Sequence, residues 1–278
     1  MISSTGGVRD PHIMRAEDGQ TFYMVATDMV AANGWDSNRG IVLLKSTDLV
    51  NWSFSAINIA TTYPTAFSDI KSAWAPQTIY DKSVGKYMVY FSMKKGANGI
   101  DRVYYSYANA SFTALESEPK LLFENPAGTA TIDADIIEKD NKYYMFMKTE
   151  NAGNGIKKAV SSTLTGPYAM EDKFLDQTDL NVEGGCIYRL TDTDNYILMY
   201  DIYKNQKYQF TETSDLDNFR VIDSETSMNF APRHGTTMAI TKEEAERLVK
   251  KWGNAANITI YSSTSIDCLL YTSPSPRD

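Results

Sequence analysis

The fold is decided by the opening stretch Gly6-Gly7-Val8-Arg9-Asp10-Pro11-His12-Ile13 and by the segment Phe22-Tyr23-Met24-Val25-Ala26-Thr27-Asp28 that follows it. The first predicts a short strand that carries a carboxylate, and the second predicts an aromatic-rich strand. Glu17-Asp18-Gly19 lies between them and favours a tight bend, because Asp and Gly tolerate unusual backbone angles. The two segments therefore predict a β-hairpin.

The chain repeats this unit. Further openings occur at Trp74-Ala75-Pro76, Ile132-Asp133-Ala134, Val182-Glu183-Gly184 and Ala231-Pro232-Arg233-His234. The first three are each followed by a turn and an aromatic-rich strand: Lys86–Phe91, Lys142–Met147 and Tyr196–Tyr200. The openings fall roughly 50 to 65 residues apart, a spacing that fits one four-stranded propeller blade per repeat. We therefore expect an all-β, five-bladed β-propeller.

A third element strengthens this interpretation. Ser46–Trp52 ends the first repeat, Ser214–Phe219 ends the fourth, and Ser162–Tyr168 is a degenerate copy in the third. In each segment a polar turn returns an aromatic residue to the sheet, where it buries a large apolar area. A β-sandwich with accidental similarity is the alternative, and the constant order of hairpin, turn and aromatic residue disfavours it.

Composition agrees with a globular all-β protein. The chain has 278 residues, of which 42% are apolar and 12% aromatic, with 18 Tyr. The net charge of -8 argues against a nucleic-acid partner, which requires a basic stripe. No apolar run approaches the length of a membrane span. The two cysteines, Cys186 and Cys268, provide no disulfide framework, and Cys186 is expected to be a small buried residue.

The C-terminal part departs from the β pattern. Thr241-Lys242-Glu243-Glu244 predicts a capping box, and Gly253 predicts the end of a short helix. Its expected packing face consists of Ala245, Leu248, Val249 and Trp252. Residues 254–278 match no blade element, and their ending resembles translated sequencing-adapter read-through. We therefore expect a propeller domain at 1–253 and a non-native or disordered tail at 254–278.

The predicted fold brings distant residues together. A propeller points the openings of its innermost strands at a central axis, so five residues are expected to converge there: Asp10, Trp74, Asp133, Glu183 and His234. Glycosidic hydrolysis needs one carboxylic acid to protonate the leaving oxygen and a second carboxylate to activate water from the opposite face. A third carboxylate raises the pKa of the acid by like-charge repulsion. The set therefore predicts a glycosidase site.

From Gly6 to Gly253 the chain resembles glycoside hydrolase family 43, whose members are five-bladed propellers. The resemblance implies a role for each matching motif. Arg9-Asp10-Pro11 supplies the general base, Ile132-Asp133 the residue that modulates the acid's pKa, and Val182-Glu183-Gly184 the general acid. It also implies that Trp74 contacts sugar, and that His234 lies near the axis, where it helps to hold a metal ion, commonly calcium.

Several assignments stay open. Asp135 shares a strand face with Asp133 and is a competing modulator. Arg233 either binds a substrate hydroxyl or only neutralises the acidic centre, and His12 is a further substrate-binding candidate. Trp74 and His234 have the alternative of being core residues without a ligand.

The fifth blade is expected to be incomplete. Residues 234–240 predict one strand, which the helix then follows. In related proteins, strands before the Arg-Asp-Pro motif complete the last blade, whereas nine residues precede Asp10 here. We therefore expect a gene cut at both ends and an exposed edge beside the first blade, unless Ile258–Ile266 fills the gap.

The resulting prediction is an inverting glycosidase acting on arabinan, arabinoxylan or arabinogalactan, outside the cell or in the periplasm. An α-L-arabinofuranosidase is favoured, followed by β-xylosidase, endo-arabinanase and exo-galactanase. The alternatives are a catalytically inactive propeller that only binds carbohydrate and a fragment that cannot fold.

Overall fold

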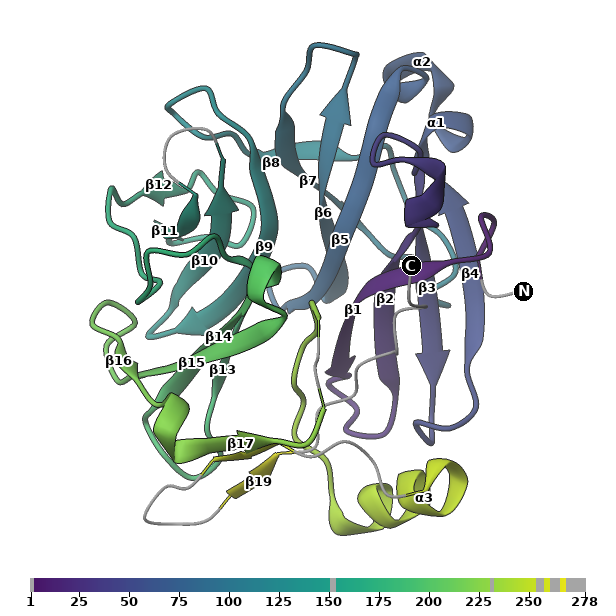
Figure 1. Ribbon diagram of the computed structural model, residues 1–278. Helices are drawn as coiled ribbons and strands as arrows, with labels where there is room; N and C mark the ends of the chain where they lie inside the picture. The colour runs from purple at the N-terminus through teal and green to yellow at the C-terminus, as the bar shows by residue number, and fades with distance from the viewer. Residues whose placement is uncertain (1–2, 151–153, 231–232, 254–257, 261–265, 269–278) are drawn as a thin grey trace.

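The computed structural model describes residues 3–150, 154–230, 233–253, 258–260 and 266–268. Four four-stranded antiparallel sheets follow one another around a common axis (Figure 1). The first blade consists of β1 Val8–Arg15, β2 Phe22–Asp28, β3 Gly40–Ser46 and β4 Ser53–Asn58. The second consists of β5 Ile70–Asp81, β6 Lys86–Lys95, β7 Asp101–Tyr107 and β8 Lys120–Phe123. The third consists of β9 Thr131–Lys139, β10 Lys142–Thr149, β11 Gly155–Ser161 and β12 Ala169–Met170. The fourth consists of β13 Glu183–Arg189, β14 Tyr196–Ile202, β15 Lys207–Thr213 and β16 Arg220–Val221.

The remaining elements are short. The fifth sheet contains β17 Thr226–Met228, β18 Ile258–Ile260 and β19 Ile266–Cys268, in that order. The α-helices are α1 Ile59–Thr62, α2 Pro64–Phe67 and α3 Lys242–Trp252. Single 3₁₀ turns lie at Ala31–Asn33, Tyr203–Asn205 and Asp223–Glu225.

The core lies between consecutive blades. On β6, Val89 and Phe91 pack against the first blade, whereas the alternate residues Met88 and Tyr90 pack with Met145 of the third. This alternation follows from the two-residue period of a strand, which sends successive side chains to opposite faces. Each blade is thus apolar on both faces, and the prediction of a propeller is confirmed.

The polar turns also form as expected. The Asp48 carboxylate accepts the backbone N–H groups of Val50 and Asn51 at 2.9 and 2.7 Å. Asp215 makes the equivalent bonds to Asp217 and Asn218 at 2.9 and 2.8 Å. These bonds to the charged form hold the pKa values of both aspartates well below their usual range.

The innermost strands of the four complete blades share one irregularity. Each contains a bulge whose key residue has a positive φ: Asp10 at 50°, Ala75 at 49°, Asp133 at 53° and Gly184 at 60°. A β-bulge leaves extra residues unpaired and re-aims their side chains, which is why bulges are common beside active sites. The bulges fix which side chains face the axis.

A ring of inter-blade hydrogen bonds surrounds the axis. In each complete blade, the N–H three residues beyond the bulge points at the preceding blade. Thr78 donates to Nδ1 of His12 at 3.3 Å and Ile187 to Oδ2 of Asp135 at 2.8 Å. Ile136 donates to the Tyr90 hydroxyl at 3.0 Å, which donates to Oε1 of Gln77 at 2.9 Å.

The fifth repeat completes this ring. The Ile13 N–H donates to Oγ1 of Thr236 at 3.1 Å, which links the fifth repeat to the first blade. The backbone of Thr237 hydrogen-bonds to the buried Cys186 thiol, which links the fifth repeat to the fourth blade. Five inter-blade connections therefore close this ring of hydrogen bonds around the axis, which we call the hub, although the fifth sheet is short.

The fifth blade is incomplete, as expected, but the strand expected at residues 234–240 does not form. Residues 233–240 contain no strand, because their hydrogen bonds and apolar contacts go to neighbouring blades rather than to a sheet of their own. The sheet is built instead from β17, which precedes Arg233, and from β18 and β19. The last two strands belong to the segment 254–278 that we set apart from the propeller, and they begin at the two ends of Ile258–Ile266, the segment that we named as the alternative source of strands. Residues 231–232 of the repeat lie outside the described chain.

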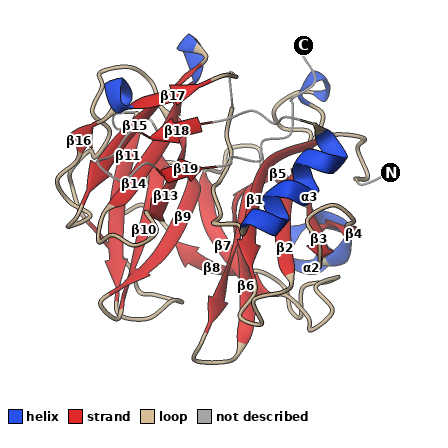
Figure 2. Ribbon diagram, turned by 90° about the horizontal axis from the view of Figure 1, so that it is seen from below, coloured by secondary structure: helices blue, strands red, loops and turns tan. Residues whose placement is uncertain are grey.

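Helix α3 packs beside β1 and β2 (Figure 2). Its capping box is confirmed: Thr241 Oγ1 accepts the Glu244 N–H, and the Glu244 carboxylate accepts the Thr241 N–H. The predicted packing face was only partly right, because Leu248 is buried but Val249 and Trp252 are exposed. The second anchor is instead Glu244, whose two oxygens bind the Arg15 guanidinium at 2.8 and 2.7 Å.

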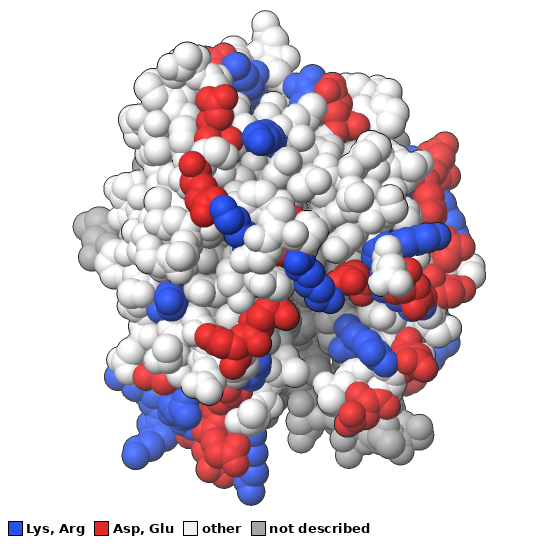
Figure 3. Space-filling model, turned by 180° about the vertical axis from the view of Figure 1, so that it is seen from behind, with Lys and Arg blue, Asp and Glu red and all other residues white. Residues whose placement is uncertain are grey.

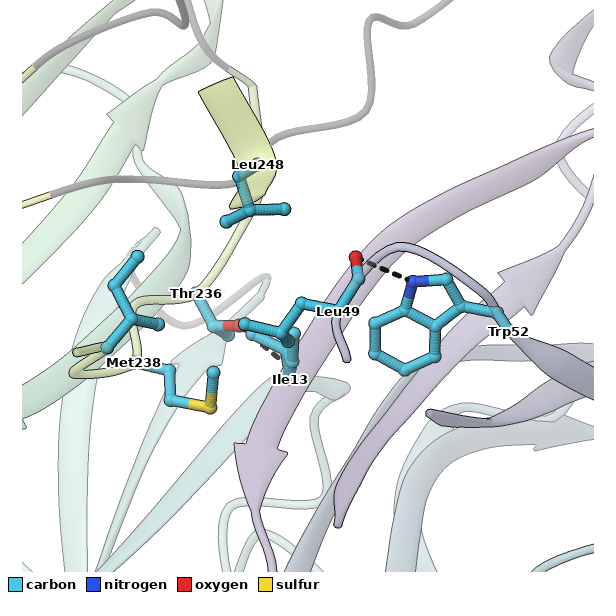
Figure 4. A pocket seen from close by; sticks show the side chains of 7 residues that line it. Ile13, Leu49, Trp52, Thr236, Met238 and Leu248 are labelled. Atoms are coloured by element: carbon cyan, nitrogen blue, oxygen red, sulfur yellow. Dashed lines mark hydrogen bonds between the residues drawn. The ribbon is translucent and has the colours of Figure 1, made fainter. Parts of the chain in front are cut away.

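A small apolar pocket lies at this seam (Figure 4). Its lining comes from the first blade, from the segment after His234 and from α3: Ile13, Leu49, Trp52, Thr236, Met238, Ile240 and Leu248. Only Thr236 supplies a polar side chain apart from the Trp52 indole, whose N–H is bonded to the Leu49 carbonyl at 3.1 Å. This pocket is packing space and contains no carboxylate for sugar chemistry.

Two surface properties bear on partners. On the face shown in Figure 3, acidic and basic side chains are interspersed rather than gathered into a basic stripe. Among the described residues, no helix is both long and apolar enough to cross a membrane.

Candidate active site

The bulges place the predicted site residues at two distinct positions. Asp10 and Asp133 occupy the positive-φ position itself, whereas Trp74 and Glu183 precede it by one residue. The residues paired with this preceding position lie on the second strands: Thr27, Ser92, Lys148 and Asp201. Two rows of side chains, from first and second strands, therefore face the same region.

His234 lies between two of the predicted catalytic carboxylates. Its Nδ1 is 3.6 Å from Oδ1 of Asp10 and 3.9 Å from Oδ1 of Asp133. Burial lowers the pKa of His234, but the negative charges of Asp133, Asp10, Glu183 and Asp201 outweigh burial and raise it overall. Three blades thus converge on one imidazole.

Asp10 and Asp133 are also held by hydrogen bonds. Oδ2 of Asp10 accepts the Thr27 hydroxyl at 2.9 Å, and Thr27 in turn accepts the Ala75 N–H at 2.8 Å. Oδ2 of Asp133 accepts the Gly184 N–H at 2.9 Å. Each carboxylate keeps its other oxygen toward His234. The next blade orients Asp133 directly, whereas Asp10 is oriented by Thr27 of its own blade, which is itself bonded to the second blade.

Glu183 is half-buried among charges of both signs. Burial and the negative charge of Asp133 raise the pKa of the Glu183 carboxyl, while Lys148 and His234 act in the opposite direction. Its Oε2 is 3.3 Å from Nζ of Lys148, and its Oε1 is 3.9 Å from Nη2 of Arg233. A carboxylic acid with a raised pKa is suited to donate a proton near neutral pH.

Arg233 is tied mainly to Asp201. Its Nε donates to Oδ2 of Asp201 at 2.7 Å, and the side chain remains 46% exposed. Burial raises the pKa of Asp201, and the Arg233 charge opposes this effect. Arg233 therefore faces both the acidic centre and solvent, and its role toward substrate stays a prediction.

Trp74 and His12 have different environments. The half-buried Trp74 donates its indole N–H to Oδ1 of Asp101 at 3.1 Å, while burial raises the pKa of Asp101 to about 6. His12 belongs to the hydrogen-bonded ring, where burial and the charge of His234 lower its pKa to about 3. His12 is thus a neutral acceptor of a backbone N–H, which fits a structural role.

Asp135, the competing modulator, also belongs to the ring. It is buried, and burial raises its pKa to about 7, although bonds from the Ile187 N–H and the Cys186 thiol oppose that shift. The two aspartates of the Asp133-Ala134-Asp135 stretch therefore have different surroundings. Asp133 faces Glu183 and His234, whereas Asp135 links the third blade to the fourth.

The metal prediction finds no donor set among the described residues. No group of three or more His, Cys, Asp or Glu side chains there is arranged to hold a metal ion. The carboxylates around His234 raise the pKa of its imidazole, whereas a metal ion binds only the neutral imidazole. These residues do not fit a direct calcium ligand set, and we assign no chemical step to a metal.

The sequence motifs missed the second-strand residues. Thr27, Lys148 and Asp201 each contact a predicted site residue, yet none lies within an opening motif. They occur near the end of the second strand of their blade, opposite the residue before the bulge. Aligning the second strands of the repeats would have indicated this position, because polar residues there interrupt apolar runs.

The arrangement is able to protonate one face of a bound group and remove a proton on another. It combines a carboxyl of raised pKa, two carboxylates fixed by backbone and hydroxyl donors, and a histidine whose pKa the surrounding carboxylates raise.

Comparisons with known proteins agree with this chemistry. The model of the family-43-related glycosyl hydrolases, described as a probable glycosyl hydrolase domain, matches residues 2–246. An α-L-arabinofuranosidase from Bifidobacterium longum subsp. longum is 26% identical over 264 residues. That match covers 75% of this chain and 24% of the Bifidobacterium protein, so the chain spans about a quarter of its length.

Solved structures share the fold. A thermostable family-43 glycoside hydrolase superposes with a TM-score of 0.62 at 16% identity, covering 100% of this chain and 98% of that one. An exo-β-1,3-galactanase from Phanerochaete chrysosporium gives a TM-score of 0.59 at 16% identity, covering 79% of this chain and 52% of that one. At these identities the similarity concerns the fold alone.

Proposed function

This chain belongs to the family-43-related glycosyl hydrolases and is a glycosidase, and we propose that it is an inverting α-L-arabinofuranosidase acting on plant cell-wall polysaccharide. The observation that carries the proposal is the convergence of Asp10, Asp133 and Glu183 around His234. The similarity to the Bifidobacterium α-L-arabinofuranosidase supports the choice of sugar.

In the proposed reaction, Glu183 donates its proton to the glycosidic oxygen as the bond to the sugar breaks. Asp10 accepts a proton from a water molecule that attacks the anomeric carbon from the opposite face. Asp133 keeps Glu183 protonated, because a neighbouring negative charge disfavours ionisation of the acid. His234 lies between the Asp10 and Asp133 carboxylates and helps to hold both in place.

A panel of aryl glycosides tests the sugar assignment. We expect hydrolysis of 4-nitrophenyl α-L-arabinofuranoside to exceed that of the β-D-xyloside and β-D-galactoside. The galactoside belongs in the panel because a solved neighbour is an exo-β-1,3-galactanase. Preference for xyloside or galactoside would reassign the sugar but keep the glycosidase chemistry.

Catalytic roles are tested by varying the leaving group. Glu183→Gln should lose activity on alkyl arabinofuranosides by a factor of about 10² to 10⁴, yet retain activity on aryl arabinofuranosides with acidic leaving groups. Asp10→Asn should lose both activities, since every substrate needs an activated water. Binding of arabino-oligosaccharide without any turnover by the wild type would favour a carbohydrate-binding propeller instead.

A further inference from the structure

Lys148 is a buried cation held between two carboxylates. It lies near the end of β10, and only 4% of its side chain is exposed. Its Nζ is 3.3 Å from Oε2 of Glu183 and 3.2 Å from Oε1 of Glu150. The ring of Tyr203 lies 5.0 Å from the same nitrogen and covers it by a cation–π contact.

The position of Lys148 follows from the bulge of the third blade. In the β9–β10 ladder Lys148 is paired with Ile132, the residue before Asp133. The bulge beside this pair turns both strands toward the axis. The side chain therefore crosses from the third blade to Glu183 on the first strand of the fourth. A buried ammonium group is costly unless it is paired, so these contacts determine where the Lys148 side chain lies.

We propose that Lys148 is a positioning residue of the active site, which holds the Glu183 carboxyl across the boundary between the third and fourth blades. Because Lys148 is shared with Glu150, it also sets the pH range over which Glu183 is protonated. This inference rests on the proposed role of Glu183 as the acid. Glu150 thereby acts on Glu183 indirectly, because its negative charge offsets part of the positive charge of Lys148.

The other charges facing Glu183 do not replace this contact. His234 and Arg233 are the remaining cations, and Arg233 is 3.9 Å away and bonded to Asp201 at 2.7 Å. The anions are Asp133 and Asp201, of which Asp133 acts more strongly on Glu183. Lys148 is thus the nearest cation to the Glu183 carboxyl among the described residues, and Asp133 and Glu150 also act on Lys148 itself.

The shared ammonium predicts opposite effects for its two partners. Lys148→Met removes the positive charge and should make Glu183 a weaker acid by about tenfold or more. Glu150→Gln leaves Lys148 with Glu183 alone and should make Glu183 a stronger acid by about two- to tenfold. If Lys148 were needed only for folding, the two variants would not shift the acid strength of Glu183 in opposite directions.

The experiment follows the Glu183 carboxyl by ¹³C NMR over a pH titration, with the resonance assigned from its loss in Glu183→Gln. This readout needs no turnover, so an inactive wild type would defeat the proposed function without deciding this inference. In active protein, the alkaline limb of kcat/KM should move in the same two directions. Lys148→Arg should give a titration midpoint of the Glu183 carboxyl close to that of the wild type.

Lys158→Met is the matched control. Lys158 is equally buried and is also paired with two carboxylates, Glu171 at 3.1 Å and Asp217 at 3.3 Å, at another place in the same blade. It should leave the Glu183 titration unchanged. Unchanged titration in both test variants, or a shift of the same sign, would overturn the proposal. If Lys148→Met does not fold, the sign of the Glu150→Gln shift decides alone.

Discussion

Gly184 is the residue at which an added side chain would press against His234. Its φ is +60°, and a Cβ built there would lie 3.0 Å from Cγ of His234. Asp10 and Asp133 adopt the same backbone conformation in other blades, and His234 faces the carboxylate oxygens of both. Glycine at 184 therefore allows His234 to approach the carboxylates.

Gly184→Ala should displace His234 and reduce kcat/KM by more than tenfold, while the positive φ costs about 1–2 kcal/mol of stability. Steady-state kinetics and chemical denaturation measure the two effects. Gly185→Ala is the control, because the nearest atom to its Cβ is the flexible Cδ1 of Ile156 at 3.0 Å. Equal activity in both variants would show that the position of His234 does not matter.

The sequence motifs identified the residues that converge but not the position of each residue relative to its bulge. Asp10, Asp133, Glu183 and His234 were predicted from five short openings, and the structure brings them together. The motifs aligned Trp74 and Glu183 with the two aspartates, whereas the bulges separate them by one residue. Lys148 was missed because its contact with Glu183 depends on strand register across two blades, which no local motif records.

Among the elements, α3 illustrates the same limit. Its start, its capping box and its end followed from local chemistry between Thr241 and Gly253. Its packing face did not, since the surface it meets contributes an arginine. The Arg15–Glu244 pair turns the helix so that Leu248 is buried and Trp252 remains exposed.

Glu244→Gln should weaken the docking of α3 by about 1–3 kcal/mol at neutral pH, because it removes a charge-assisted pair. The Arg15 hydrogen bond lowers the folded-state pKa of Glu244 below its ordinary value of 4.5. Its stabilisation is therefore present above pH 4.5 and lost as the pH falls through the folded-state pKa.

Urea denaturation of wild type and variant at pH 7 and at lower pH measures this difference. The gap in unfolding free energy should close as the medium becomes acidic. The exposed Glu246→Gln serves as control and should change stability little at either pH. A gap that stays constant with pH would show that the pair does not anchor α3.

For the whole molecule, ring closure depends on the hub more than on a complete fifth sheet. The repeat spacing predicted five units, and their fivefold arrangement appears in the five inter-blade connections. The expected strand at 234–240 failed because Thr236 and Thr237 serve neighbouring blades. Sequence periodicity reports that a repeat exists, but tertiary partners decide whether it becomes a strand.

Thr236→Val should destabilise the protein by about 1–3 kcal/mol, because it leaves the buried Ile13 N–H without its acceptor. Thr131→Val is the matched control: its hydroxyl is buried and has no hydrogen-bond partner among the described residues, so its loss should be neutral or stabilising. Equal losses in thermal denaturation of the two variants would contradict a closed hub.

In the proposed reaction, Asp10 and Glu183 catalyse a single displacement at one sugar. Proton NMR of the first product formed from an aryl α-L-arabinofuranoside, recorded before mutarotation, tests it most directly. We predict that β-L-arabinofuranose appears first, as required when water attacks opposite the leaving group. Initial release of the α-anomer would mean a retained configuration, and would contradict the roles given to Asp10 and Glu183.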